Sequence, residues 1–295
     1  MKVLVTGATG FLGSHIVKTL LTENYDIVIL KRSFSDTRRI WNYLDKIQSF
    51  DIDLVPIETA FEKCGQFDCV IHTATNYGRR GETAVEVFES NLSFSLRLLE
   101  TAAFFNTATF FNTATFFNSA TILYSYLNYY VLSKRQFEDW GRIFANQGKI
   151  QFVNIKLEHI YGPGDDFSKF TTWIMQSCLK NIEKIELTMG EQKRDFIYID
   201  DVVDAYKLLL GKWRILGEGF HEFDLGSGKA VSIREFVEMV GRTTGASTKF
   251  IFGAKKYLEN EIMHSEADIS KLSDLGWKPK CDLITGLKKM IESVK

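Results

Sequence analysis

The feature that most constrains the fold is a glycine-rich turn close to the N-terminus. Residues 2–6 (KVLVT) are typical of a short buried strand, and Gly7, Gly10 and Gly13 follow in a GxxGxxG pattern. A helical pattern and a second strand-like run at 26–30 come next, so the chain opens with a parallel β-α-β unit. Glycines there let the backbone approach a pyrophosphate at the helix N-terminus. We predict a dinucleotide-binding turn formed by Gly7, Thr9, Gly10, Phe11, Leu12 and Gly13.

The alternation of strand and helix continues through the first half of the chain. Strands are predicted at 69–72, 109–112 and 152–157, and a long amphipathic helix is predicted over 84–105. This order of elements predicts an α/β fold, a Rossmann-type doubly wound parallel sheet.

Two lobes are expected from the change of pattern after Pro163. Residues 1–163 are predicted to form the NADP-binding Rossmann domain, and segments near 196–228 are expected to return to it. Residues 164–295 show shorter elements, so we expect them to form mainly a smaller C-terminal mixed α/β lobe that binds the substrate.

A six-residue near-repeat lies between these elements. TAAFFN at 101–106 is followed by TATFFN at 107–112 and again at 113–118. Three copies of six residues are too short for a repeat architecture. We expect the first copy to end the long helix, the second to form a strand and the third to form a loop, because tertiary context overrides local propensity.

Composition excludes several classes of protein. The 36 basic and 37 acidic residues give a net charge of −1, which argues against binding to nucleic acid or to a membrane surface through bulk charge. No run approaches the roughly 18 apolar residues of a membrane span, and we expect a cytoplasmic protein. The acid pair Asp165 and Asp166 lacks a third ligand and the four cysteines lack metal spacing, so we expect no metal site.

The end of the second strand indicates which dinucleotide is bound. NAD-binding proteins carry an acidic residue there, whereas this chain has Lys31, Arg32 and Ser33. A guanidinium can pair with a 2′-phosphate, so we predict NADP(H) in preference to NAD(H). Asp53 and Leu54, after the third strand run, are expected at the adenine.

A YxxxK pattern supplies the candidate catalytic pair. Tyr130 and Lys134 are four residues apart, so both side chains share one helix face. We expect the ammonium and a bound nicotinamide cation to lower the pKa of the phenol, so that Tyr130 exchanges a proton near neutral pH. Thr115, placed just after the strand predicted at 109–112, is the candidate to hydrogen-bond the reacting oxygen, and Thr113 is the alternative.

These motifs resemble the NAD-dependent epimerase/dehydratase family, the extended short-chain dehydrogenases. The resemblance covers almost the full length and is carried by VTGATGFLGSH at 5–15, VIHTAT at 70–75 and QKRDFIYIDDVVDAY at 192–206. It implies a nucleotide-diphosphate sugar as substrate. The residues that it adds are Thr73 and Ala74 at the cofactor, Lys134 at the nicotinamide ribose and Arg194 at the sugar nucleotide.

Four further segments carry a narrower resemblance: TNYGRRGETAVEVFESN at 75–91, KLEHIYGPGDDFSKF at 156–170, GEQKRDFIYIDD at 190–201 and ENEIMHSEADI at 259–269. In these segments the chain most resembles the CDP-paratose and CDP-abequose synthases of that family. These enzymes use NADPH to reduce the 4-keto group of CDP-4-dehydro-3,6-dideoxy-D-glucose, for O-antigen synthesis. The chain departs from the wider family at Leu258, where many members carry a second arginine, and at His159, where epimerases often carry asparagine. The expected substrate-binding residues are Tyr77, Arg79, His159, Lys169 and Arg194.

The resemblance leaves three activities to weigh. A dehydratase places an acid pair after the catalytic threonine, where this chain has Phe116 and Phe117, so dehydration is not expected. Lys31 and Arg32 indicate an exchangeable NADPH, so reduction by NADPH is favoured. An NAD-dependent nucleotide-sugar 4-epimerase is the alternative, and a non-catalytic NADPH-sensing protein is the second alternative. The helices at 84–105 and around Tyr130 are expected to form a four-helix homodimer interface, as they do in relatives.

Overall fold

The computed structural model describes residues 1–107, 114–124 and 126–294. The chain divides into two compact units. Unit 1 comprises Met1–Lys156 and Val203–Phe223, and unit 2 comprises Leu157–Val202 and Asp224–Lys295. Among the helices of the described ranges, none has both the length and the apolar character needed to cross a bilayer.

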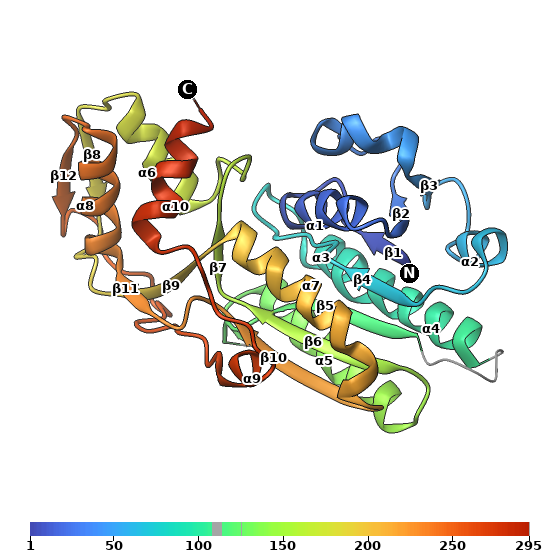
Figure 1. Cartoon of the computed structure of the whole chain (residues 1–295). Coiled ribbons are helices and arrows are strands. Elements are labelled where there is room, and N and C mark those ends of the chain that lie inside the picture. Colours follow the sequence, from blue (N-terminus) through green and yellow to red (C-terminus); the bar gives the residue numbers. More distant parts are fainter. Residues whose placement is uncertain (108–113, 125, 295) are drawn as a thin grey trace. The chain divides into compact units, whose positions relative to one another are not determined.

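Unit 1 contains a seven-stranded sheet in the order β10-β6-β5-β4-β1-β2-β3 (Figure 1). The pairs β1–β2, β1–β4, β2–β3 and β4–β5 are parallel. This order confirms the predicted Rossmann-type sheet. The strands are β1 (Lys2–Thr6), β2 (Asp26–Lys31), β3 (Gln48–Asp51), β4 (Cys69–His72), β5 (Thr115–Thr121), β6 (Gln151–Leu157) and β10 (Phe220–Leu225).

Helices cover both faces of this sheet (Figure 1). On β5, Phe116 packs against Phe137 of α5, whereas Ser119 hydrogen-bonds Tyr206 of α7. Residues three apart on a strand point to opposite faces, which is why β5 is fully buried. The helices of this part are α1 (Phe11–Thr22), η1 (Arg38–Lys46), α2 (Glu58–Cys64), α3 (Ala84–Phe88), η2 (Glu89–Ser93), α4 (Phe94–Thr107), α5 (Tyr129–Asn146) and α7 (Ile199–Leu216), whose first residues belong to unit 2.

Two predictions for unit 1 need correction. The helix predicted over 84–105 consists of α3 and α4 joined by the π-helical turn η2. The third hexamer copy, 113–118, was expected to be a loop, but β5 begins at Thr115 because this run is buried on both faces of the sheet. The strand predicted at 109–112 lies outside the described residues.

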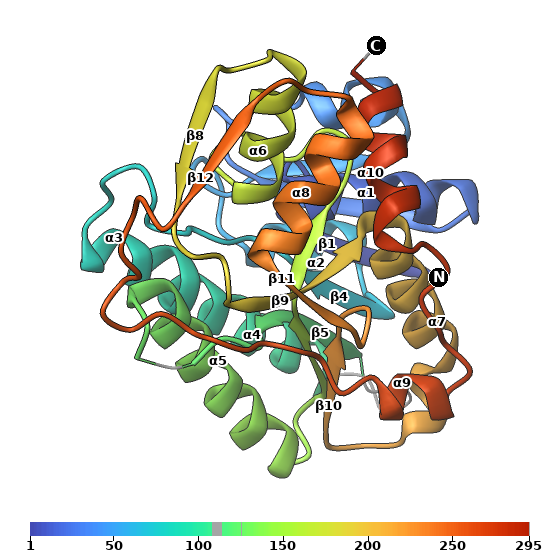
Figure 2. The same ribbon diagram turned by 90° about the vertical axis from the view of Figure 1, so that its left-hand side faces the viewer.

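Unit 2 is a mixed α/β arrangement. It holds a three-stranded sheet, β11-β9-β7, and a two-stranded sheet, β12-β8, and α8 packs against α6 and α10 (Figure 2). The buried carboxylate of Asp195 ties three segments together, since it accepts hydrogen bonds from the backbone of Ser227, Gly228 and Ala267. The elements are β7 (His159–Tyr161), α6 (Phe170–Leu179), β8 (Lys184–Leu187), β9 (Lys193–Tyr198), β11 (Ala230–Ser232), α8 (Ile233–Thr244), β12 (Lys249–Phe252), α9 (Ser270–Asp274) and α10 (Leu283–Glu292).

Candidate active site

The glycine turn joins β1 to α1 and packs against the exit of β4. Gly7 has a φ of +70°, and a Cβ there would lie 2.6 Å from Ala74 N and from Thr73 Oγ1. A Cβ at Gly13 would lie 2.2 Å from Gly7 O. At Gly10 the only described contact of a Cβ would be Gly7 O, at 3.1 Å, so space remains in front of the helix. Two glycines thus permit close packing, and the third leaves room for a ligand.

The N-terminus of α1 fits a dinucleotide pyrophosphate. Among the described residues, no side chain caps this helix, and its first turn contains no acidic residue. Its backbone N–H groups and the positive end of its dipole therefore face the space that Gly10 leaves open. Thr9 and Leu12 lie within the same turn and helix start.

Residues at the ends of β2 and β3 form local pairs. Lys31 forms an ion pair with Asp51, its partner in the β2–β3 register. Asp53 accepts hydrogen bonds from Ser33 N (2.7 Å) and Ser33 Oγ (2.5 Å), and these lower the pKa of its carboxyl. Leu54 is exposed.

Arg32 differs from its neighbours at this edge of the sheet. Its guanidinium lies 4.7 Å from the centre of the exposed Phe34 ring. Among the described residues it has no ion-pair partner, in contrast to Lys31. Of the two predicted cations at this strand end, Arg32 is therefore the one whose charge no carboxylate neutralises within residues 1–107, 114–124 and 126–294.

Lys134 lies in the interior of unit 1, 1% exposed. Its Nζ donates a hydrogen bond to Ser119 O of β5 at 3.0 Å. Burial lowers the pKa of Lys134 to about 7, because the charged form loses its hydration. The helix α5 holds this side chain at β5 and begins at the N-cap Asn128, whose Oδ1 accepts from Val131 N at 3.0 Å.

Tyr130 lies in the first turn of α5, and its phenol lies beside the side chain of Thr121, the last residue of β5. Burial raises the pKa of Tyr130 above its usual value, while the neighbouring Thr121 hydroxyl and the charge of Arg79 act in the opposite direction. The expectation of a lowered pKa is therefore wrong for the chain itself, because desolvation outweighs the neighbouring groups. A protonated phenol at neutral pH is suited to donate a proton.

The structure places Thr115 away from this pair. Thr115 begins β5, is fully buried and donates to Gln151 Oε1 at 2.6 Å. Thr121 ends the same strand, about 20 Å further along at roughly 3.3 Å per residue. The prediction that Thr115 follows the strand is wrong, and the threonine beside Tyr130 is Thr121. The alternative, Thr113, lies outside the described residues.

Aromatic and cationic groups surround Tyr130 on the side of the β4 exit. The Tyr77 ring lies 4.9 Å from the Tyr130 ring, and the Arg79 guanidinium lies 4.9 Å from the centre of the Tyr77 ring. Both were predicted to bind substrate, and the structure places them in contact with or close to the candidate proton donor.

Asn91 links the β4 exit to α5. In η2, the buried Asn91 accepts from Asn76 N at 2.7 Å and donates to Asn76 O at 2.8 Å and Ser133 Oγ at 3.1 Å. Single π turns often occur at functional sites, where they re-aim a side chain. Asn91 thereby fixes the residue next to Lys134, a positioning role that sequence spacing alone did not assign.

His72, at the end of β4, has a structural role. Its ring is fully buried and lies 2.7 Å from Thr6 Oγ1 and 2.8 Å from Ser95 Oγ. Burial holds its pKa well below the usual value, so the imidazole is neutral and joins β1, β4 and α4.

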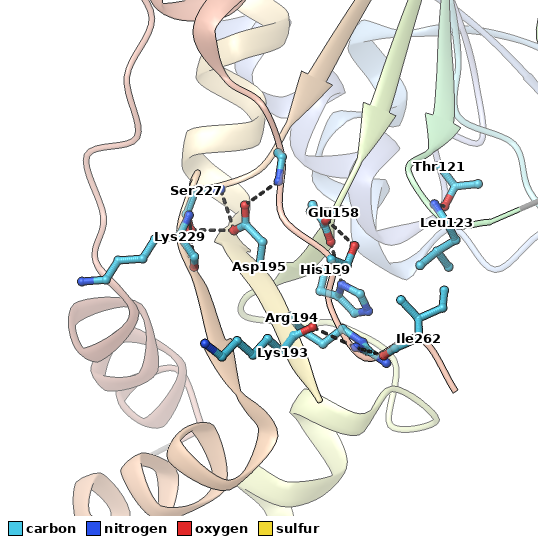
Figure 3. Close-up of polar contacts among 12 residues, drawn as sticks. Thr121, Leu123, Glu158, His159, Lys193, Arg194, Asp195, Ser227, Lys229 and Ile262 are labelled. Carbon is cyan, nitrogen blue, oxygen red and sulfur yellow. Dashed lines mark hydrogen bonds and ion pairs between the residues drawn. The ribbon is translucent and has the colours of Figure 1, made fainter. Parts of the chain in front are cut away.

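In unit 2 each predicted substrate-binding side chain is paired with a carboxylate (Figure 3 shows His159 with Glu158). Glu158, the partner of His159, is buried and also accepts a hydrogen bond from Ser265 Oγ, so its carboxylate is held by two residues. Arg194 in addition donates to the carbonyl oxygens of Lys193 and Ile262. The pairs are His159 with Glu158 (2.9 Å), Lys169 with Asp165 (2.9 Å) and Arg194 with Glu261 (2.6 Å), and Leu258 is exposed.

Comparison with known proteins identifies relatives of the whole chain. The NAD dependent epimerase/dehydratase family matches residues 3–219. The CDP-abequose synthase of Salmonella muenchen is 34% identical over 295 residues, which is 98% of this chain and 97% of that protein. Solved structures share the fold: the UDP-glucose 4-epimerase of Thermotoga maritima with UDP-glucose has a TM-score of 0.83 at 23% identity and covers 100% of this chain and 98% of its own. The UDP-glucose 4-epimerase of Thermus thermophilus with NAD has a TM-score of 0.81 at 22% identity, covering 99% and 98%.

Proposed function

The chain belongs to the NAD dependent epimerase/dehydratase family, and on this premise we propose that it is an NADPH-dependent 4-ketoreductase of a nucleotide-diphosphate 4-dehydro-deoxysugar. The proposed substrate is CDP-4-dehydro-3,6-dideoxy-D-glucose and the product is CDP-paratose or CDP-abequose, made in the cytoplasm for a surface polysaccharide. The observation that carries the proposal is the Tyr130–Lys134–Thr121 arrangement in a chain that is similar to a CDP-abequose synthase along its full length.

The chain's own residues account for the proton that the reduction requires. Bound NADPH supplies a hydride to the carbonyl carbon at C4. Tyr130, protonated because burial raises its pKa, gives its phenolic proton to the carbonyl oxygen. The Thr121 hydroxyl lies beside the phenol and would hydrogen-bond the same oxygen. Lys134 is held at the end of β5 and would bind the nicotinamide ribose.

The proposed preference for NADPH depends on Arg32. Because Lys31 is paired with Asp51, Arg32 is the cation at the end of β2 that forms no ion pair with the part of the chain that the structure describes. A planar guanidinium can form two parallel hydrogen bonds with a 2′-phosphate. We therefore assign recognition of the 2′-phosphate to Arg32 rather than to Lys31.

The experiment that tests the function follows the absorbance of NADPH while purified protein acts on enzymatically prepared CDP-4-dehydro-3,6-dideoxyglucose. Stoichiometric oxidation, with a Tyr130→Phe variant that binds NADPH and turns over at least 100-fold more slowly, is the expected result. NMR of the product then gives the configuration at C4. No NADPH consumption, together with nicotinamide that co-purifies tightly bound, would overturn the reductase in favour of a 4-epimerase.

We also propose that the protein is a homodimer through α3, α4 and α5. The helices α3 and α5 contact each other within unit 1. Their outer surfaces expose Val85, Phe88, Trp140 and Ile143, an apolar set that a second copy would cover. Light scattering should give a dimer for the natural protein and a monomer for Trp140→Glu; a natural protein that is monomeric at micromolar concentration would contradict this assignment.

A further inference from the structure

We propose that Arg135 is a positioning residue that fixes the turn after β5 and, through this turn, the Thr121–Tyr130 pair. The inference rests on the proposed function, because it concerns how that site is held in place. Arg135 follows Lys134 on α5 but touches neither the Tyr130 phenol nor the Lys134 ammonium in any described contact. Its action is therefore indirect.

The first observation is the contact of Arg135 with the turn itself. One guanidinium nitrogen donates to Ile122 O at 3.2 Å and to Leu123 O at 3.1 Å. In the same turn, Leu123 N donates to Thr121 Oγ1 at 3.3 Å. The guanidinium thus binds the carbonyl oxygens of the two residues that follow Thr121. The first of these carbonyls belongs to the same peptide group as Leu123 N, which orients the Thr121 hydroxyl (Figure 3 shows Thr121 and Leu123).

The second observation is that Arg135 is itself anchored. Its other terminal nitrogen donates to Glu138 Oε2 at 3.1 Å, one helical turn further along α5. Glu138 is largely buried and hydrogen-bonds the carboxyl of Glu222 on β10, which pairs with Lys156 of β6 at 2.9 Å. Burial raises the pKa of Glu138, so the two carboxyl groups can share a proton instead of repelling each other. One side of the Arg135 guanidinium is therefore anchored by Glu138, which is linked through Glu222 to β10 and β6. The other side binds the carbonyl oxygens of the turn after β5.

A lysine cannot reproduce this arrangement. A guanidinium presents several donors in one plane, so it can bind a carboxylate and two carbonyl oxygens at once, whereas an ammonium is a single point of charge. Arg142 provides the matched control on the same helix. It contacts Glu138 at 3.7 Å and Glu222 at 3.8 Å, is about half exposed and has no described contact with residues 121–124.

The test is a double-mutant cycle with Arg135→Met and Thr121→Ala, measured as kcat for the reduction. Arg135→Met should lower kcat about 10- to 100-fold with an unchanged Kd for NADPH, because a displacement of about 1 Å has a cost of this size. The double variant should be within about threefold of the slower single variant, since Arg135 is proposed to act through the Thr121 hydroxyl, which the double variant lacks. Arg142→Met should stay within about threefold of the natural protein. Losses that multiply in the double variant, or an equal loss for Arg142→Met, would overturn the proposal.

A second measurement does not depend on the reaction. Hydrogen exchange at the Leu123 amide should be faster in Arg135→Met than in Arg142→Met, and Arg135→Lys should lie between Arg135→Met and the natural protein. Should Arg135→Met fail to fold, Arg135→Lys takes its place in both assays. Equal exchange rates of the Leu123 amide in Arg135→Met and Arg142→Met would overturn the positioning role, even if no substrate were turned over. Faster exchange without any NADPH oxidation by the natural protein would support the positioning role and count against the proposed reaction alone.

Discussion

Two strand-to-helix connections on either side of β4 build the candidate site in different ways. The connection from β1 to α1 is short and consists mainly of backbone, since Gly7, Gly10 and Gly13 leave no side chains between the turn and its neighbours. The connection from β5 to α5 is longer and is held by side chains, namely Thr121, Asn128 and Arg135. Both strands pair with β4, so the same sheet supports both designs.

The difference shows which sites can be recognised in a single sequence. A backbone-built turn requires glycine at particular positions, here Gly7 and Gly13, because a Cβ at either would collide, so its pattern is visible in the sequence. A side-chain-built turn depends on partners that are distant in the chain, such as Glu222 for the Glu138–Arg135 anchor. Such partners become visible only once the strands are paired.

The largest effects are expected from breaking the glycine turn. In Gly13→Ala the new Cβ would lie 2.2 Å from Gly7 O, so the turn must move, and we expect at least a 100-fold loss of NADPH affinity together with a lower Tm. Gly10→Ala meets only Gly7 O at 3.1 Å, so it should keep its Tm and lose about tenfold in affinity. Fluorescence titration and thermal melts measure both. The backbone-built description fails if Gly13→Ala retains natural affinity and Tm.

The next effect distinguishes the two ends of β5. Thr121→Val should lower kcat about 30-fold or more, because it removes the hydroxyl that lies beside the Tyr130 phenol and is proposed to hydrogen-bond the reacting oxygen. Thr115→Val should leave kcat within about threefold and reduce the free energy of unfolding by about 1–2 kcal/mol, because Gln151 loses a buried partner. Steady-state kinetics and urea unfolding separate the two effects. The opposite pattern, with Thr115→Val inactive, would restore the original assignment.

This pair also shows how far the sequence could be interpreted. The doubly wound parallel sheet, the glycine turn and the Tyr130–Lys134 helix face follow from local patterns, and the fold class was confirmed. The position of β5 was wrong because three similar hexamers carry nearly the same propensity, and burial on both faces, not propensity, selects the strand. The raised pKa of Tyr130 was missed for a related reason, since desolvation depends on packing that no spacing reveals.

A smaller effect is expected at the end of β2, where the adenosine 2′-phosphate is proposed to bind. Arg32→Ala should raise KM for NADPH about tenfold and leave KM for NADH nearly unchanged, because only NADPH carries the 2′-phosphate. Lys31→Ala is the matched control and should affect both cofactors alike, since Lys31 is paired with Asp51. Ratios of kcat/KM for the two cofactors measure this. A loss of NADPH preference in Lys31→Ala but not in Arg32→Ala would transfer the role to Lys31.

The smallest effect is on the free energy of unfolding and its dependence on pH. It is expected from Lys134 at the β5–α5 connection and not from the glycine turn, which contains no titratable side chain. Lys134 is buried with a pKa of about 7, whereas an unfolded lysine titrates near pKa ~10.4. Between these values the unfolded chain binds more protons than the folded one, so the free energy of unfolding should rise with pH from about 7 to 10. Below pH 7 both states are protonated and the destabilisation is largest.

Lys134→Met should therefore be more stable than the cofactor-free natural protein by on the order of 2 kcal/mol at pH 7, after allowing for the hydrogen bond lost at Ser119 O. This advantage should shrink toward about pH 9.5, and kcat should fall at least 100-fold. Urea unfolding at several pH values measures the difference. A pH-independent difference would show that Lys134 keeps an ordinary pKa. The expected result would mean that burying the Lys134 ammonium lowers the stability of the folded protein, and that the β5–α5 connection keeps this residue for catalysis despite that loss. The glycine turn buries no charged side chain and has no such cost.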